Sequence, residues 1–170
     1  KRAMGGRLDL FPAAMAVAKE LTNPSQEAMG DGPLAAEAQS VSKLKKAVLM
    51  VMGKAAQDLG SALKDEQEVL MHLADMVIET YVAESVLLRV QKLIGQKGEE
   101  AMAHEAAMAQ VYVYRALDKV WNAGKEAIAA FVGEGEQMMM LKGLRYLTKA
   151  DLVNTRTLRR KVADQMIEKN

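Results

Sequence analysis

The positions of the prolines constrain this chain more than any other feature. All three, Pro12, Pro24 and Pro33, lie within the first 33 residues. Because proline disrupts a helix interior, no such barrier to long helices remains beyond Pro33. The apolar half of the composition is mainly Ala, Leu, Val and Met, and only 4% of residues are aromatic. Apart from Val these residues are strong helix formers, and no strand-like alternation persists, so we predict an all-α fold.

Apolar residues recur at intervals of three and four, which is the spacing of one helix face. We expect helices over about 8–21, 34–63, 65–94, 98–131 and 136–147, and a last one capped by Asn154 or Thr155. The breakers within 23–33 divide an N-terminal helix and linker, residues 1–33, from a helical bundle domain, residues 34–170. Long helices with short connections favour an up-and-down antiparallel bundle with long central helices and a short C-terminal helix. Either 8–21 or 136–147 supplies its fourth member.

The expected helix over 65–94 has the widest apolar surface. Asp65 is its candidate N-cap, with Glu68 three residues later as in a capping box, and Gly95 is its candidate end. A helix that is apolar nearly all round belongs in the middle of a bundle. We therefore expect this helix to be central. Its apolar positions include Leu70, Leu73, Val77, Tyr81 and Leu88.

Charge and composition exclude several classes of protein. The chain has 23 basic and 22 acidic residues, and its one basic cluster, at 156–161, is too short for a nucleic-acid surface. Cysteine is absent, which suits a reducing compartment. No uncharged apolar run approaches the ~20 residues of a membrane span, and no signal peptide is recognisable. We expect a cytoplasmic location, with membrane association left open. Because the chain begins with Lys1, we expect it to be part of a longer protein.

The sequence contains no phosphate loop, dinucleotide-binding fingerprint or nucleophile elbow. The sharpest chemical candidate is a metal site, because Glu68 and His72 are four residues apart, as are Glu100 and His104. Di-metal bundles place Glu and His three apart and add two more Glu from other helices. The spacing here favours solvated pairs at helix ends, with a metal-carboxylate bundle as the alternative.

Polar and aromatic residues within the expected helices suggest packing contacts. Glu84 and Arg89 stand in apolar surroundings, which favours interhelical salt bridges; a buried pair that sets helix register is the alternative. Tyr114 and Trp121 are seven residues apart and share a helix face, whereas Tyr112 points elsewhere. Such aromatics are usually core or interface anchors.

The segment from Met138 to Lys149 interleaves apolar residues with cations. Met138, Met139, Met140 and Leu141 are followed by Lys142 and Arg145. This composition is typical of a short helix that closes a bundle or meets another protein, because Met adapts to irregular surfaces. It is also the composition of a helix that lies on an anionic membrane, which stays the alternative.

The region from Asp65 to Ile94 resembles the C-terminal extension of the very-long-chain type of acyl-CoA dehydrogenase, in particular its bacterial relatives. The resemblance covers the helix layout of about 34–168 and is specific over about 65–94. A weaker similarity occurs at 147–150. The residues that carry it are Leu73-Ala74-Asp75, Ile78, Tyr81, Ala83-Glu84-Ser85 and Leu88-Arg89.

The resemblance implies a parent enzyme that uses FAD to introduce a 2,3 double bond into a long-chain acyl-CoA. It implies that this chain is the added helical domain, associated with homodimers and membrane contact. The β domain and the segment that carries the glutamate base are absent. We therefore assign no catalytic, flavin-binding or metal-binding residue to this chain, and we expect FAD only in the parent.

The leading hypothesis is a packing domain whose partners are its own catalytic domains and a second copy, with peripheral membrane contact as a further option and no nucleic acid. A free-standing helical scaffold is the remaining alternative. Exposed apolar area on such a domain predicts self-association. The expected interaction residues are Tyr81, Glu84, Arg89, Met138, Met139, Lys142 and Arg145.

Overall fold

The computed structural model describes residues 10–22 and 30–168, and within these ranges the chain is helical without strands. This confirms the predicted all-α class. A short 3-10 segment, η1 (Gly60–Asp65), joins the second helix to the third. The α-helices are α1 (Leu10–Thr22), α2 (Ala35–Leu59), α3 (Gln67–Lys97), α4 (Ala103–Phe131), α5 (Glu134–Thr148) and α6 (Thr155–Glu168).

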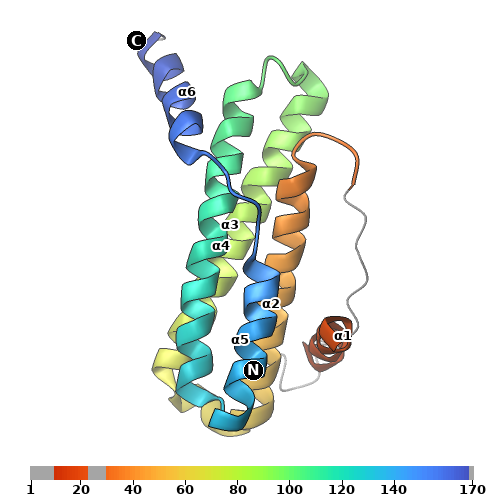
Figure 1. The fold of residues 1–170 in the computed structure, drawn as a ribbon, viewed down its shortest axis with the longest axis vertical. Coiled ribbons are helices and arrows are strands. Elements are labelled where there is room, and N and C mark those ends of the chain that lie inside the picture. The colour runs from red at the N-terminus through yellow and green to blue at the C-terminus, as the bar shows by residue number, and fades with distance from the viewer. Residues whose placement is uncertain (1–9, 23–29, 169–170) are drawn as a thin grey trace.

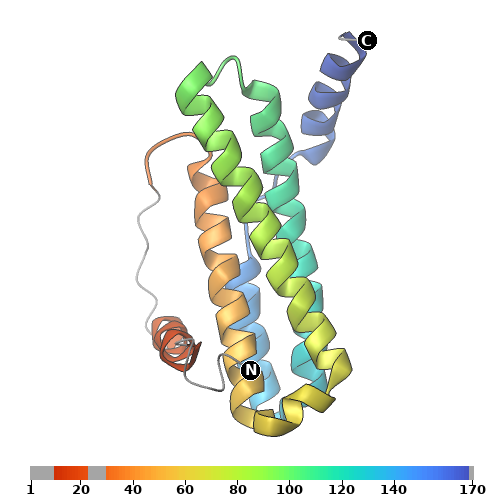
Figure 2. The same ribbon diagram turned by 180° about the vertical axis from the view of Figure 1, so that it is seen from behind.

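Four of these helices alternate in direction and form the bundle. α2, α3 and α4 are its long members, and α5 is the short fourth member (Figures 1 and 2). α1 lies across the outer side of α2, and α6 extends past the end of the bundle beside α4. The predicted up-and-down bundle is thus confirmed, and α5 rather than α1 completes it.

Most of the core forms one buried cluster along the bundle. Val17 of α1 belongs to the same buried cluster as the inner faces of α2 to α5. A smaller cluster of Val90, Ile94, Met102 and Ala109 closes the end where α3 turns into α4. The largest fully buried side chains are Leu44, Met76, Ile128, Leu144 and Leu147.

Two glycines allow helices to approach closely. A Cβ added at Gly53 of α2 would lie 2.3 Å from the Cβ of Ala14 on α1. A Cβ added at Gly124 of α4 would lie 2.9 Å from Leu144 Cδ2 on α5. Both contacts are too short for a larger residue, so these glycines fix how closely α1 and α5 pack on the long helices.

The connection between α2 and α3 differs from the prediction. The second helix ends at Leu59 rather than Leu63, because Gly60 adopts φ 51° and starts η1. Asp65 is the last residue of η1 and is not the cap of α3. Glu66 holds the N-cap position, with no capping hydrogen bond from its side chain.

Three further boundaries move by a few residues. α3 continues through Gly95 to Lys97, because the residue with left-handed backbone is Gly98, at φ 87°. α4 begins at Ala103 after turns over 99–102. Gly133 is the N-cap position of α5, which therefore starts at Glu134. The predicted cap of the last helix is confirmed, since Asn154 Oδ1 accepts a hydrogen bond from Thr157 N at 3.2 Å.

Candidate interaction surfaces

The outer face of α3 carries a regular row of exposed side chains, which we call the α3 stripe. Four members are large and apolar, with exposed fractions of 55–69% for Met71, Ile78, Tyr81 and Leu88. Ala74 and Ser85 lie between them and are also exposed. The intervals alternate between three and four residues, as at the a and d positions of a coiled coil. The stripe is therefore Met71, Ala74, Ile78, Tyr81, Ser85 and Leu88.

This exposure corrects the expectation that α3 is central. Met76, Thr80, Ala83 and Leu87 of its inner face are buried, but the opposite face is open. α3 packs on α4 and α2 only along its inner side. The wide apolar surface that suggested burial on all sides is instead one core face plus one exposed face.

The predicted interaction residues of α3 lie in or beside the stripe. Tyr81 belongs to it and is the most exposed large apolar side chain of the helix. Glu84 Oε1 accepts a hydrogen bond from Lys45 Nζ of α2 at 2.8 Å. This contact confirms the predicted interhelical salt bridge for Glu84. Arg89 is exposed, and no ion pair forms on it among the described residues. The predicted pairing of Arg89 within the bundle is therefore wrong.

The Met-rich helix α5 has one buried and one exposed face. Met140, Leu144 and Leu147 are in the core, whereas Met138 and Met139 are 62% and 66% exposed. α5 and α3 appear on opposite sides of the bundle in Figures 1 and 2. The predicted interaction residues thus form two separate surfaces, one on each side.

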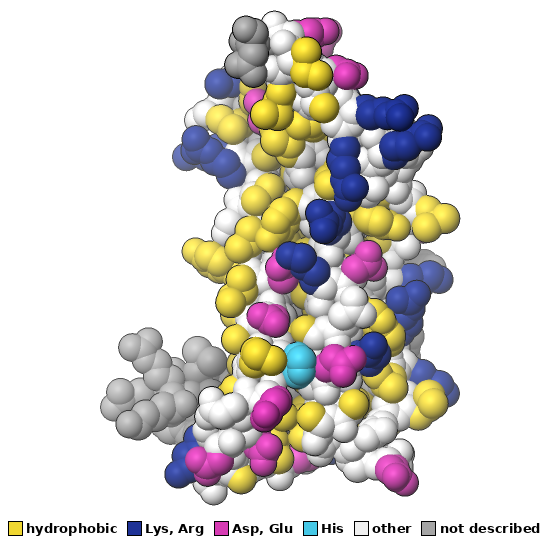
Figure 3. Space-filling view, turned by 90° about the vertical axis from the view of Figure 1, so that its left-hand side faces the viewer, with side chains coloured by type: hydrophobic (Ala, Val, Ile, Leu, Met, Phe, Trp, Pro, Cys, Tyr) yellow, Lys and Arg dark blue, Asp and Glu magenta, His cyan; other side chains and the backbone are white. Residues whose placement is uncertain are grey.

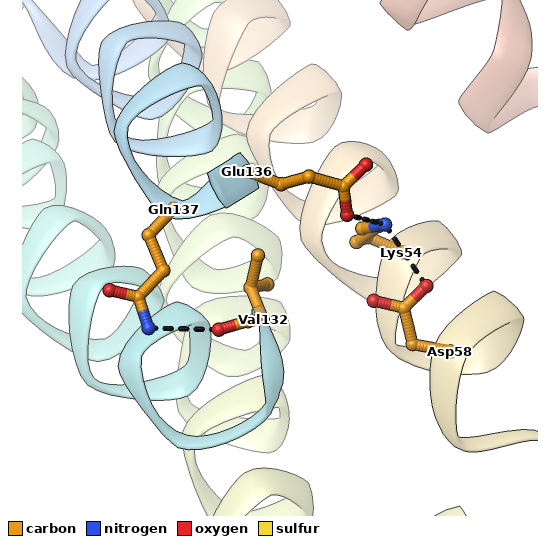
Figure 4. Close-up of polar contacts among 5 residues, drawn as sticks. All are labelled: Lys54, Asp58, Val132, Glu136 and Gln137. Atoms are coloured by element: carbon orange, nitrogen blue, oxygen red, sulfur yellow. Dashed lines mark hydrogen bonds and ion pairs between the residues drawn. The ribbon is translucent and has the colours of Figure 1, made fainter. Parts of the chain in front are cut away.

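An ion-pair network fixes the start of α5. Lys54 Nζ of α2 lies 2.6 Å from Glu136 Oε2 and 3.0 Å from Asp58 Oδ1 (Figure 4). The hydrogen bond to Glu136 raises the pKa of Lys54, against the lowering effect of burial, and Asp58 adds to the rise. Gln137 Nε2 also donates to the carbonyl oxygen of Val132 at 2.8 Å. This end of α5 is held in place by polar contacts.

The two cations of α5 differ in their surroundings. The guanidinium of Arg145 lies 5.2 Å from the ring centroid of Trp121 on α4, a cation–π contact. Lys142 is exposed and lines a largely apolar cavity of about 380 Å³ between α1, α2 and α5. The other residues around this cavity include Leu21, Met50, Met139 and Tyr146.

A shallow hollow between α3 and α4 is lined by charged and polar residues, among them His72, Glu79 and Lys119. Glu79 of α3 forms an ion pair with Lys119 of α4 and accepts a hydrogen bond from Tyr112 Oη at 3.2 Å. Burial raises the pKa of Tyr112, and the charge of Glu79 adds to the rise. On the face drawn in Figure 3, a histidine lies among acidic side chains in the lower half.

The candidate metal pairs do not converge. Glu68 is exposed, and Glu100 lies in a turn before α4, so Glu100 and His104 do not share a helix as predicted. No group of three or more His, Asp or Glu side chains within 10–22 and 30–168 is arranged to hold a metal ion. None of the helices described is both long enough and apolar enough to cross a bilayer.

The all-α bundle agrees with what a comparison with protein families shows. Residues 43–146 match the family described as acyl-CoA dehydrogenase, C-terminal domain. Because the match covers more than half of the chain, the chain belongs to this family. The resemblance stated from 65–94 is thereby confirmed at the level of the acyl-CoA dehydrogenase C-terminal domain.

Two individual proteins are similar to this chain over nearly its full length. A probable acyl-CoA dehydrogenase of Bacillus subtilis (strain 168) is 35% identical over 169 residues, which is 99% of this chain and 28% of that protein. A crystal structure of an acyl-CoA dehydrogenase from Bacillus anthracis complexed with FAD has a TM-score of 0.93 and 35% identity. It covers 99% of this chain, which spans 29% of that structure. The chain thus spans less than a third of either relative.

Sequence reasoning missed several contacts that organise these surfaces. It gave Tyr112 and Trp121 no partners on other helices, because such partners depend on the rotation of each helix about its axis. The signal for the α3 stripe was present, in the alternating intervals of three and four from Met71 to Leu88. The residues of the stripe could not be separated from the core residues in the sequence, because Leu73 and Val77 between them are also apolar.

Proposed function

We propose that this chain is the non-catalytic C-terminal helical domain of an FAD-dependent acyl-CoA dehydrogenase of the very-long-chain type. The parent enzyme would oxidise long-chain acyl-CoA to 2-enoyl-CoA. Family membership supports this proposal, as does 35% identity to a probable acyl-CoA dehydrogenase and to one complexed with FAD. The flavin and the catalytic base would belong to the remainder of the parent.

The role proposed for this chain is docking by helix packing. The α3 stripe carries this proposal, because it places four large apolar side chains outside a core that is already complete without them. Contiguous exposed apolar side chains on a soluble fold are typical of interfaces. The partners would be the parent's catalytic domains and a second subunit.

Peripheral membrane contact is proposed for the opposite surface. Met138 and Met139 are exposed beside Lys142, which combines apolar insertion with attraction to anionic lipid. We expect the full-length gene product to be cytoplasmic and to co-sediment with vesicles of anionic phospholipid. The double variant Met138→Glu, Met139→Glu should lose this binding, whereas Met15→Glu, at a 67% exposed residue of α1, should retain it. Equal sedimentation of both variants would remove the membrane role.

The parent activity is tested by the visible absorption spectrum of the full-length gene product. A flavin spectrum that bleaches when a long-chain acyl-CoA is added is the expected result. A short-chain acyl-CoA serves as the control for chain length and should bleach it less. A colourless product would overturn the dehydrogenase proposal, whereas equal bleaching by both substrates would overturn only the long-chain assignment.

A further inference from the structure

We propose that the α3 stripes of two copies of the parent protein pair with each other in antiparallel orientation. The inference rests on the docking role proposed above, and it specifies the partner of this surface. Alternating intervals of three and four over 71–88 match the contact seam of two helices that pack along their length. In the described ranges no helix of the same chain covers this seam, since all six side chains are exposed.

The order of side-chain sizes along the stripe is palindromic. It runs large, small, large, large, small, large, from Met71 to Leu88, and it reads the same in both directions. An isologous twofold interface pairs residue i of one copy with residue j of the other, and residue j with residue i. With this order of sizes, each residue of the stripe meets a residue of its own size class. Antiparallel pairing would place Met71 opposite Leu88 of the second copy, Ala74 opposite Ser85, and Ile78 opposite Tyr81. The pairing of Ala74 with Ser85 occurs twice in such a dimer, and these small side chains allow the two helix backbones to approach each other.

The charges at the ends of the stripe favour the same orientation. Glu68 lies before Met71, whereas Arg89 and Lys92 lie at the other end, and all three are exposed. In the antiparallel arrangement Glu68 of each copy lies next to Arg89 and Lys92 of the other. In a parallel arrangement Lys92 would face Lys92. The one favourable parallel pair, Glu84 with Arg89, would use a carboxylate that already binds Lys45.

Inter-copy cysteine cross-linking of the full-length gene product tests this pairing. Ala74→Cys and Ser85→Cys are suitable because both residues are small and exposed, and these 170 residues contain no other cysteine. Residues 74 and 85 are ~16 Å apart along one helix, too far for a bond within a chain. We expect cross-linked dimers when the two single variants are co-expressed. Either variant alone should give no more cross-linked dimer than the wild-type protein gives.

Three results would contradict the proposal. Absence of a cross-link in the co-expressed pair would show that the stripe does not meet a second copy in this register. Cross-linking of Ala74→Cys alone would indicate parallel pairing. A yield unchanged by adding Tyr81→Glu would also contradict it, because this 69% exposed side chain lies at the centre of the stripe. Met15→Glu, at a 67% exposed residue of α1, is the matched control and should preserve the yield.

The visible spectrum of the same samples separates this inference from the dehydrogenase proposal. A yellow, substrate-bleached protein without the cross-link would retain the proposed activity and overturn the pairing. A colourless protein with the cross-link would retain the pairing and overturn the proposed activity. Circular dichroism of each variant confirms that the helices are intact, so loss of the cross-link cannot be attributed to unfolding.

Discussion

The two faces of α3 have similar apolar content but opposite surroundings. Leu87 is 3% exposed and packs in the core, whereas its neighbour Leu88 is 56% exposed on the α3 stripe. The inner face stabilises the bundle, and the outer face adds nothing to that core. The difference shows that apolar content alone does not locate a helix within a fold. The positions of the apolar residues relative to the buried face of the helix indicate a candidate interface.

The largest expected effect comes from replacing these two adjacent leucines in turn. Leu87→Ala leaves a cavity in the core and should lower the free energy of unfolding by about 2–5 kcal/mol. Leu88→Ala removes only an exposed side chain and should change it by about 0.5 kcal/mol or less. Urea unfolding of this chain at low concentration measures both. Similar losses for the two variants would contradict the distinction between the faces.

A second test concerns how closely α1 packs on the bundle. Gly53→Ala places a Cβ 2.3 Å from the Cβ of Ala14, so α1 must move. We expect a loss of about 1–3 kcal/mol from overpacking, and faster proteolysis within α1. Gly95→Ala on α3 is the control, because a Cβ at this position would contact no side chain and no other element within 4 Å. That variant should gain about 0.5–1 kcal/mol from helix propensity. Equal thermal shifts for both would refute the close approach.

A smaller effect is expected at the network that fixes α5. Lys54→Met removes the pairs with Glu136 and Asp58 and should cost about 1 kcal/mol. The raised pKa of Lys54 implies that this contribution is complete below the ordinary lysine pKa and is lost as pH rises through the raised value. Lys125→Met, at an exposed pair with Glu126 of the same helix, should have almost no effect. Chemical denaturation of both variants at neutral and strongly alkaline pH checks this prediction.

The smallest expected effect is that of the Tyr112 hydroxyl. Tyr112→Phe removes its hydrogen bond to Glu79 and should cost about 0.5–1.5 kcal/mol. Because the pKa of Tyr112 is raised, its contribution holds below the ordinary tyrosine pKa and disappears as pH rises through the raised value. Phenolate absorbance during alkaline titration should show the loss of a late-ionising tyrosine in the variant. Tyr81→Phe, at a side chain that is 69% exposed, should leave the stability almost unchanged.

Much of the fold could be predicted because it depends on local patterns. Proline placement and three-to-four spacing identify the helices, and short connections determine their antiparallel order. Helix ends are harder, because Gly53, Gly60, Gly95 and Gly98 occur in similar surroundings in the sequence. Of these four, only Gly60 and Gly98 adopt positive φ, and no pattern in the sequence distinguishes them.

The interaction surfaces could be predicted only in part. Tyr81, Met138 and Met139 were predicted to be interaction residues because they belong to unusually apolar helices, and all three side chains are exposed. The contact of Arg145 with Trp121 and that of Glu84 with Lys45 depend on how α5 and α2 rotate against their neighbours. No pattern within a single helix contains this information. The family resemblance depended on particular residues within 65–94. Most of these residues lie either on the buried inner face of α3 or on the α3 stripe.

The most direct test of the central claim is static light scattering of this 170-residue chain over rising concentration, beside its Tyr81→Glu and Met15→Glu variants. If the α3 stripe pairs with a second copy, the wild type and Met15→Glu should rise from the monomer mass of 18.6 kDa toward twice that value. Tyr81→Glu should remain at the monomer mass, because it places a charge at the centre of the stripe. A wild-type chain that stays monomeric at high concentration, or a Tyr81→Glu variant that associates equally well, would contradict the account.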